Sequence, residues 1–467
     1  RAKPSAIREH SFGESHSTPA GVRSQRGRRR DTLPAVRVVL MVLLACLGLA
    51  PATALAHPAP FSYLDLTITP DLASHTVAGT VRIRLKALAA LDDIPLDRGA
   101  LDLDAATIGG ISQTVTLGPR RAIVRVRPAV AAGTISEIDL SFHGTPGSGL
   151  QFPADRTQVY TIFTTSDWMP SVDRPDDRAT LRLRVVLPAG LSAAGVGRAG
   201  SVTTNADGRH EHEWRLESAA PTYTFGFAAA PFTVVTSGRL RYLGEGFSAT
   251  ELRRIFAGTE GMLRFFEMRS GVRYPHATYT QALVARTVGQ EMSGLSLLSE
   301  DYGRAVLADS TAITLAAHEA AHQWWGNLVT CQAWTHFWLN EGMATFMAAA
   351  YLESRFGRPA YDRAVERFRV EYARVRGASA DKPLVFPDWS RPSADDRTLV
   401  YQKGALVLHE LRVLLGDAAF WPALRAYTRG AAGRSVTTQD FQHAIETATG
   451  RDLSAFFDRW VYARPPG

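Results

Sequence analysis

Four residues of segment 311–342 have the types and spacing of a metal-dependent hydrolytic site. His318 and His322 are four positions apart, so on a helix both imidazoles project from one face and can bind one ion. Glu319 would lie beside that ion, where a carboxylate can act as a general base. Eighteen residues separate His322 from Glu341, which is enough to leave the helix and enter a second one. The pattern predicts one zinc ion per chain, held by His318, His322 and Glu341.

Two helices must position these residues. Ser310 or Asp309 can cap the first helix, and good helix formers carry it towards Gly326, so the two histidines are expected in its last turns. The stretch WLNEGMATFMAAAYLESRF, residues 338–356, predicts a second helix that faces the first. Cys331 lies between the two helices and is interpreted as a packing residue.

The two segments HEAAHQWWGNLVT and WLNEGMATFM together resemble the zinc signature of the aminopeptidase N family. Members of this family are gluzincins with a thermolysin-like catalytic domain. The resemblance implies zinc ligands His318, His322 and Glu341, with Glu319 as the general base. It also implies an enzyme that hydrolyses N-terminal peptide bonds, so peptides are the expected substrates.

Two further segments resemble motifs of the same family. In VGQEMSGLSLLSEDYG, Gly289, Glu291 and Gly294 are similar to the segment G-x-M-E-N-x-G, although its Met and Asn are absent. The resemblance implies that Glu291 binds the substrate amino terminus, while glycines such as Gly289 let the strand edge approach the peptide backbone. Tyr401 begins YQKG, similar to Y-x-K-G, whose Tyr stabilises the tetrahedral intermediate. A surface Glu and a Tyr packed at a helix start are the alternatives.

One region departs from the family pattern. Relatives carry a Gln, and often a Glu, shortly before a D-x-P segment, and these residues help to hold the free amino group of the substrate. The corresponding stretch here, FTTSDWMPSVDRPDDRA (residues 163–179), contains no such Gln. Asp167 is the candidate acidic replacement for substrate binding. The alternative is that Asp167 is a turn residue.

The remaining pattern predicts an α+β multidomain fold. From residue 57 to 235, apolar and charged residues alternate in short runs such as Val81 to Lys86, which is typical of an antiparallel β-domain. The opening of this part resembles the family's N-terminal saddle domain, so a saddle or sandwich is expected. Helical periodicity dominates from residue 236 to 467, the expected thermolysin-like, mainly helical zinc peptidase domain. The large C-terminal helical domain of many relatives is expected to be missing.

Residues 1–56 predict a disordered leader and an export signal. This segment holds nine Arg or Lys and three Asp or Glu, so most of the net charge of +7 lies there and nothing favours nucleic-acid binding by the folded part. A basic stretch, the apolar run 38–50 and the sequence Ala54-Leu55-Ala56 are typical of an exported protein, periplasmic or secreted. The alternatives are an uncleaved signal and a lipid on Cys46. Membrane attachment is expected only through one of these two. No pattern predicts an oligomeric state.

The sequence therefore favours an exported zinc aminopeptidase, with two alternatives. One is a zinc endopeptidase of the same fold. The other is a zinc-stabilised binding or scaffold protein without catalysis. The presence of Glu319 and Tyr401 argues against a scaffold, because a scaffold needs neither residue.

Overall fold

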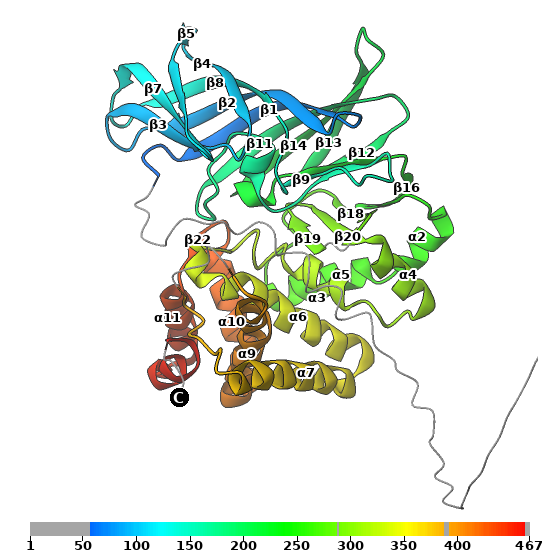
Figure 1. The fold of residues 1–467 in the computed structure, drawn as a ribbon. Coiled ribbons are helices and arrows are strands. Elements are labelled where there is room, and N and C mark those ends of the chain that lie inside the picture. The colour runs from blue at the N-terminus through cyan, green and yellow to red at the C-terminus, as the bar shows by residue number, and fades with distance from the viewer. Residues whose placement is uncertain (1–56, 287–288, 387–391, 463–467) are drawn as a thin grey trace, which may run out of the picture. The chain divides into compact units, whose positions relative to one another are not determined.

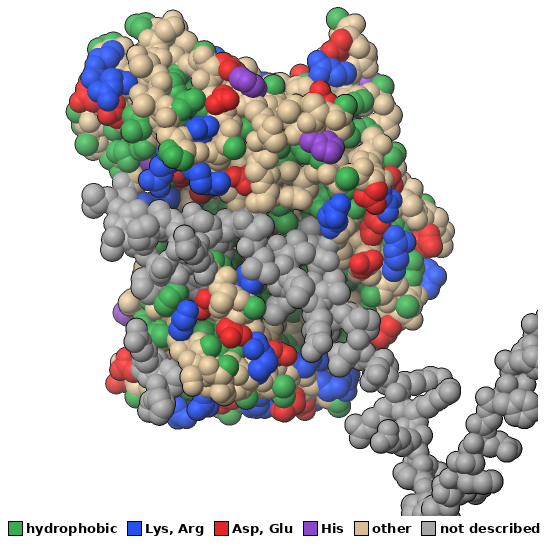
Figure 2. Space-filling view, in the orientation of Figure 1, with side chains coloured by type: hydrophobic (Ala, Val, Ile, Leu, Met, Phe, Trp, Pro, Cys, Tyr) green, Lys and Arg blue, Asp and Glu red, His purple; other side chains and the backbone are tan. Residues whose placement is uncertain are grey.

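The structure, a computed structural model, describes residues 57–286, 289–386 and 392–462. The leader and its predicted signal lie outside these residues. Within the described part of the chain, no helix combines the length and the apolar character that crossing a bilayer requires. On the face drawn in Figure 2, positive and negative side chains are interspersed.

The first part of the chain is built on an eight-stranded sheet (Figure 1). The predicted alternation is confirmed in β2, where Val81, Ile83 and Leu85 are buried and the intervening Arg and Lys are exposed. Most neighbours are antiparallel, as predicted, but β1 and β11 pair in parallel. In spatial order the strands are β13 (Arg198–Thr204), β14 (His210–Pro221), β11 (Arg178–Leu187), β1 (Phe61–Asp71), β2 (Thr76–Lys86), β8 (Ile135–Gly144), β4 (Asp102–Ile108) and β5 (Ile111–Ser112).

Two smaller sheets complete this β-domain. One contains β3 (Leu91–Asp97), β7 (Arg121–Val130) and β6 (Thr114–Leu117). The other contains β12 (Ser192–Gly195), β15 (Phe227–Ala230), β10 (Val159–Thr161) and β9 (Leu150–Gln151). A short 3₁₀ turn, η1 (Thr165–Asp167), follows β10.

The second part begins with a five-stranded sheet. Its order is β16 (Thr233–Ser237), β17 (Leu240–Gly244), β18 (Tyr279–Val284), β20 (Leu295–Ser299) and β19 (Gly289–Met292). The predicted domain boundary at residue 235 falls inside β16. The short β19 is an edge strand, so its outer backbone groups have no strand partner within the sheet.

Helices form the rest of this second domain, and both predicted ligand helices are present. The helices are α2 (Ala249–Ile255), α3 (Thr259–Ser270), α4 (Glu300–Ala308), α5 (Thr314–Ala321), α6 (Trp338–Phe356), α7 (Arg358–Gly377), α8 (Ala394–Thr398), α9 (Gly404–Leu415), α10 (Asp417–Ala431), α11 (Thr438–Thr449) and α12 (Ser454–Phe457). Between α5 and α6, β21 (Thr330–Cys331) pairs with β22 (Ser435–Val436) and is followed by the turn η3 (Trp334–His336). The π-helical turns η4 (Leu399–Lys403) and η5 (Asp458–Tyr462) adjoin α8 and α12.

The second ligand helix has the predicted bounds, whereas the first is shorter than predicted. α5 begins at Thr314 after Ile313, which makes no side-chain cap. Asp309 instead accepts hydrogen bonds from the backbone and hydroxyl of Thr311 and closes a separate turn. The helix ends at Ala321 with His322 as its C-cap, four residues before Gly326. The prediction was therefore wrong at both ends. At the start, Asp309 closes a local turn and does not cap the helix. At the end, the helix stops at its C-cap His322, before Gly326.

Candidate functional site

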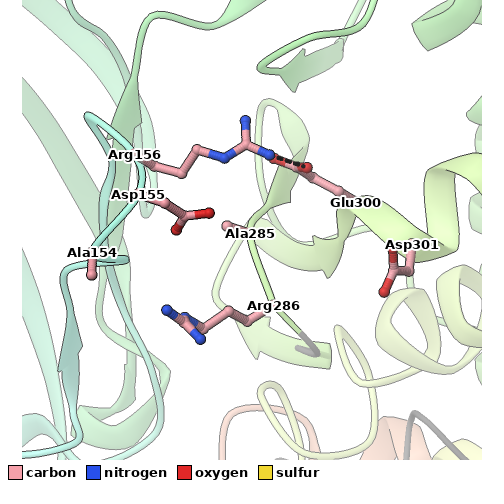
Figure 3. A pocket seen from close by; sticks show the side chains of 7 residues that line it. All are labelled: Ala154, Asp155, Arg156, Ala285, Arg286, Glu300 and Asp301. Carbon is pink, nitrogen blue, oxygen red and sulfur yellow. Dashed lines mark hydrogen bonds and ion pairs between the residues drawn. The ribbon is translucent and has the colours of Figure 1, made fainter. Parts of the chain in front are cut away.

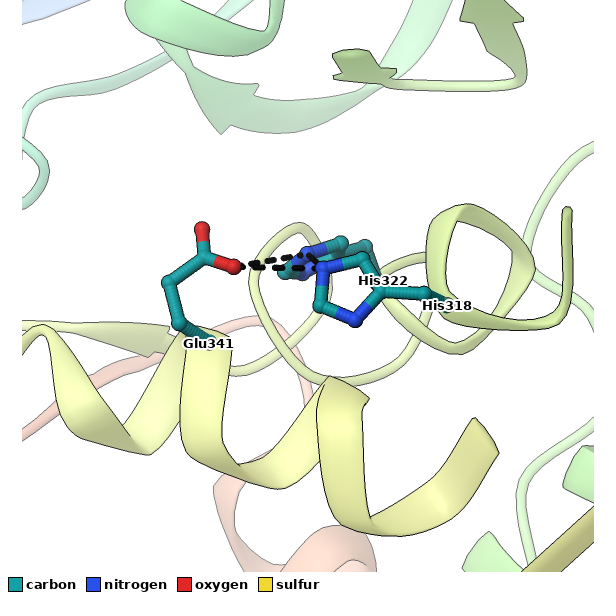
Figure 4. Close-up of side chains that lie close together, drawn as sticks. All are labelled: His318, His322 and Glu341. Carbon is teal, nitrogen blue, oxygen red and sulfur yellow. Dashed lines mark hydrogen bonds and ion pairs between the residues drawn. The ribbon is translucent and has the colours of Figure 1, made fainter. Parts of the chain in front are cut away.

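The two histidines and Glu341 meet at one point between α5 and α6 (Figure 4). The Nε2 atoms of His318 and His322 are 3.0 Å apart. Glu341 Oε2 lies 3.2 Å from Nε2 of His318 and 3.3 Å from Nε2 of His322. All three predicted ligands are thus brought together.

This triangle has the size that a zinc ion requires. Ligand atoms at about 2.0–2.1 Å from a tetrahedral zinc lie roughly 3.3 Å from one another. His322 Nδ1 lies 2.9 Å from the Trp325 carbonyl, which can only accept, so Nδ1 carries a proton and leaves Nε2 for a metal. Thr345 Oγ1 lies 3.4 Å from Nδ1 of His318. The residues present fit a metal ion with nitrogen and oxygen ligands.

The charges at this point also favour a cation. Glu291 and Glu319 each place a carboxylate oxygen in a second cluster with His322, whose ligand atoms lie within 4.8 Å of one another. Burial opposes the ionisation of Glu341, but the charge of His322 and the closeness of both imidazoles lower its pKa to about 2. Burial raises the pKa of Glu291 to about 7, against the lowering effect of His322, and raises that of Glu319 well above its usual range. Three buried carboxylates therefore share one small region.

Glu319 lies beside the ligands and against the edge strand. Its side chain is buried on α5, and Oε2 has no hydrogen-bond partner among the described residues. A Cβ atom at Gly289 would lie 2.5 Å from Glu319 Oε1, so any larger residue at this position would have to displace that carboxylate. Glycine at position 289 therefore leaves room for the predicted base beside the predicted substrate-binding strand.

Glu291 is on β19 and is 2% exposed. Its Oε2 accepts a hydrogen bond from Gln290 Nε2 at 3.0 Å, whereas Oε1 has no partner among the described residues. Because Glu291 belongs to the cluster that also contains Glu319 and His322, the structure places it beside the ligands, and the surface alternative is wrong. Its free oxygen is available to a positively charged group.

Tyr401 lies in the π-helical turn η4, a type of irregularity found frequently at functional sites. Its ring stacks on that of His318, with centroids 5.8 Å apart and an interplanar angle of 19°. Burial, followed by the charges of Glu341, Glu291 and Glu319, raises its pKa well above the usual value, so the phenol stays protonated at neutral pH. The buried ammonium of Lys403 holds this turn by binding Asp381 Oδ1 at 2.8 Å.

Asp167 is the one predicted site residue that the structure does not bring to the cluster. It ends the turn η1 and is buried within the β-domain. Its carboxylate accepts hydrogen bonds from Arg120 Nη2 and Gly149 N, both at 3.0 Å, and from Ser148 Oγ at 3.3 Å. Asp167 therefore has the contacts of a structural turn residue, and its role in substrate binding stays a prediction that these contacts do not support.

Two glutamines that the sequence analysis did not single out hold the β19 segment. Gln323 Oε1 accepts from Gly294 N at 2.9 Å, and its Nε2 donates to Met292 O at 3.0 Å. This ties the turn between β19 and β20 to the residue that follows His322. Gln290 binds Glu291 directly. In the sequence, each glutamine is recognisable only as the neighbour of a predicted ligand or binding residue. Such neighbours are too common to predict a role by themselves.

A separate cavity of about 380 Å³ lies where the β-domain meets the ends of β18 and β20 (Figure 3). Asp155, Arg156, Arg286 and Glu300 contribute to its lining, and Arg156 Nη2 is 3.1 Å from Glu300 Oε2. None of the predicted site residues lines this cavity. It is distinct from the ligand cluster.

Comparison with known proteins agrees with this geometry. Residues 256–460 match the family described as Peptidase family M1 domain. The chain is 32% identical over 215 residues to aminopeptidase N of Lactococcus lactis, covering 43% of this chain and 25% of that protein. It is 26% identical over 444 residues to aminopeptidase N of Lactobacillus helveticus, covering 88% and 51%. The chain thus spans about a quarter of the first relative and about half of the second.

Solved structures extend the match to both domains. An M1 zinc metallopeptidase mutant from Deinococcus radiodurans, bound to a Tyr-Ser-Ala substrate, superposes with a TM-score of 0.75 at 26% identity. The match covers 88% of this chain and 96% of that one. The family match over residues 256–460, the relatives and the solved structures together support an aminopeptidase N-like gluzincin.

Proposed function

We propose that this protein is a zinc aminopeptidase that hydrolyses the first peptide bond of peptides with a free amino terminus. The observation that carries the proposal is the buried carboxylate of Glu291, which has one free oxygen beside the metal-ligand cluster. An ionised carboxylate there can pair with an α-ammonium group and so place the first peptide bond next to Glu319. The names and the bound peptide of the relatives support the same activity.

Bound by His318, His322 and Glu341, zinc would supply Lewis-acid chemistry for peptide hydrolysis. Glu319 Oε2 accepts a proton from the attacking water and later delivers it to the leaving amine. The Tyr401 hydroxyl, kept protonated, donates a hydrogen bond to the oxygen of the attacked carbonyl as negative charge develops there. The exposed edge of β19 can pair with the peptide backbone.

The test uses peptides that differ only at the amino terminus. One charge-assisted hydrogen bond is worth about 1.5–3 kcal/mol, so wild-type protein should prefer free over N-acetylated peptides by roughly ten- to a hundredfold. Glu291→Ala should abolish the preference, whereas Asp167→Asn, a buried acidic residue of the β-domain, serves as the control and should keep it. Elemental analysis should find one zinc per chain, and 1,10-phenanthroline should stop cleavage.

The endopeptidase alternative is favoured by one observation. Arg120 binds the carboxylate of Asp167, so Asp167, the predicted second anchor of the amino terminus, is already engaged within the β-domain. Equal cleavage of free and acetylated peptides would exclude the aminopeptidase and leave the endopeptidase.

We also propose that the protein is exported. The support is the basic and apolar pattern of residues 1–56 alone. Fractionation of cells that express the full chain, compared with cells that express residues 57–467, tests this. Recovery of both proteins in the cytoplasm would contradict it.

A further inference from the structure

Gln290 occupies an unusual position next to the predicted substrate-binding residue. It lies on the edge strand β19 and is fully buried. Its amide makes two hydrogen bonds in different directions: Oε1 accepts from Phe163 N at 2.8 Å, and Nε2 donates to Glu291 Oε2 at 3.0 Å. One side chain therefore connects the β-domain backbone to the carboxylate of Glu291.

The bond to Phe163 fixes which way the amide of Gln290 is oriented. A backbone N–H can only donate, so the oxygen of the amide must face Phe163 and the NH₂ group must face Glu291. Gln290 is thus held as a donor towards the carboxylate. A methionine, which the family pattern has at this position, has no N–H group to donate.

Phe163 is itself held firmly. Its φ of 42° lies in the left-handed region, which costs a bulky residue on the order of 1–3 kcal/mol. The ring packs against Tyr223, Trp334 and Phe337, with centroids 5.4, 5.3 and 6.3 Å away. This strained residue begins the stretch 163–179, in which the glutamine expected from the family is absent. The backbone N–H of Phe163, in the β-domain, is therefore connected to Glu291 through the side chain of Gln290.

We propose that Gln290 is a positioning residue for the recognition of the amino terminus, and this proposal rests on the proposed function. By occupying Oε2 of Glu291, Gln290 fixes the carboxylate and leaves Oε1 for the α-ammonium group. Because Gln290 acts through Glu291, its loss should weaken the binding of free peptides and leave the chemistry on N-acetylated peptides unchanged.

Gln158 provides a matched control. It is also a buried glutamine that links the two domains, since its Oε1 accepts from Ala285 N at 2.7 Å and its Nε2 lies 3.4 Å from Glu245 Oε2. The substitutions Gln290→Met and Gln158→Met therefore remove comparable interdomain bonds. Of the two glutamines, Gln290 is the one that is hydrogen-bonded to Glu291.

The measurement is the ratio of kcat/KM for a free peptide to kcat/KM for its N-acetylated form, on zinc-loaded full-length protein. Gln290→Met should lower this ratio by roughly tenfold, the effect of one hydrogen bond to a charged group, through a higher KM. The kcat/KM for the acetylated peptide should stay within about twofold of the wild-type value, because indirect effects of a substitution are typically of that size. Gln158→Met should keep the wild-type ratio.

An unchanged ratio in Gln290→Met, with a selective wild type, would overturn the proposal and leave the proposed function standing. A wild-type ratio near one would overturn both. Thermal unfolding of each variant identifies a folding defect. If Gln290→Met does not fold, Gln290→Asn replaces it, because this shorter amide cannot bridge Phe163 and Glu291, and an unchanged ratio there overturns the proposal.

Discussion

Glu291, Glu319 and Glu341 are three buried carboxylates in one small region, and their partners give them different roles. Glu341 faces two imidazoles and has a lowered pKa. Burial instead raises the pKa of Glu291 to about 7 and that of Glu319 well above its usual range. Environment rather than residue type therefore separates the proposed ligand from the proposed base and the proposed anchor.

Glu319→Gln should retain zinc and lose turnover. The substitution keeps the size of the side chain and changes none of the three ligand residues, but an amide cannot accept the proton of the attacking water. We expect kcat to fall by about 10²–10⁴-fold, with one zinc per chain by elemental analysis. A variant that keeps zinc and hydrolyses peptides at a near-normal rate would remove Glu319 as the base.

Tyr401→Phe should lower kcat more than it raises KM. The lost hydroxyl is assigned to the transition state, whereas stacking of the ring on His318 is retained. Steady-state kinetics on a free peptide measure the two constants. A higher KM with an unchanged kcat would assign Tyr401 to substrate binding instead.

The ligand residues could be predicted from sequence because helical geometry alone relates His318 to His322. Asp167 could not, because its role depends on which way a short turn faces. The same limit applies to Gln290, whose two partners come from different parts of the chain.

At the level of elements, the site depends on a close crossing of α6 and η4–α9. A Cβ atom at Gly342 would lie 2.8 Å from the Cα of Gly404, so the two backbones touch where both residues are glycine. Gly342 directly follows Glu341, and Gly404 follows the turn that carries Tyr401. The crossing thereby brings Glu341, a proposed metal ligand, close to Tyr401, the proposed hydrogen-bond donor to the attacked carbonyl.

Gly342→Ala should separate these elements. The added methyl group meets backbone rather than a flexible side chain, and such overpacking typically costs about 1–3 kcal/mol of unfolding free energy. Denaturant unfolding measures the loss. Gly377→Ala, on α7, is the control and should not be destabilised, because its added Cβ meets no atom beyond the helix's own backbone within 4 Å. Equal stability of the two variants would contradict the inference that the contact between Gly342 and Gly404 requires glycine.

The bounds of α6 could be predicted because a long apolar pattern and Gly357 mark it. Those of α5 could not, because it starts without a side-chain cap and ends in a turn in which Gly326 N donates to Val329 O. Capping residues and glycines in the sequence therefore predict the bounds of a helix only where those residues form its ends.

For the whole molecule, stability should depend on pH through Asp177. Phe61 N donates to its Oδ1 at 3.0 Å, Oδ2 has no partner among the described residues, and burial raises its pKa from 3.8 to about 7. An acid with a raised folded pKa contributes stability that is fully present below the unfolded pKa and is lost as pH rises through the folded value. Stability from this group should therefore fall between about pH 4 and pH 7.

Asp177→Asn removes this dependence and keeps an acceptor for Phe61. The variant should unfold at a higher temperature than wild type at about pH 8, where wild type must bury a charge, and show no such gain at about pH 4. Thermal unfolding at the two pH values measures the difference. An equal change at both values would contradict the assignment.

Arg178 joins the β-domain to the segment between the two ligand helices. From β11, its guanidinium donates to Thr330 Oγ1 at 2.7 Å and to Asn327 O at 2.9 Å. Tyr223 adds a hydroxyl bond to Gly326 O at 2.9 Å and itself accepts from Asn340 Nδ2, next to Glu341. This connection between domains could not be predicted from the sequence, because it depends on how two separately patterned parts meet.

Arg178→Met should therefore loosen the metal site from a distance. Arg184→Met is the matched control, since Arg184 is on the same strand but bonds Asp65 and Thr67 within the β-domain. Losing a charged donor to buried acceptors costs about 1.5–3 kcal/mol, so zinc release to a chelator should be several-fold faster in Arg178→Met than in Arg184→Met. Equal release rates would show that the Arg178 contact does not support the metal site, and the other bonds of the loop 326–331, such as those of Thr330 and Asn340, would then suffice.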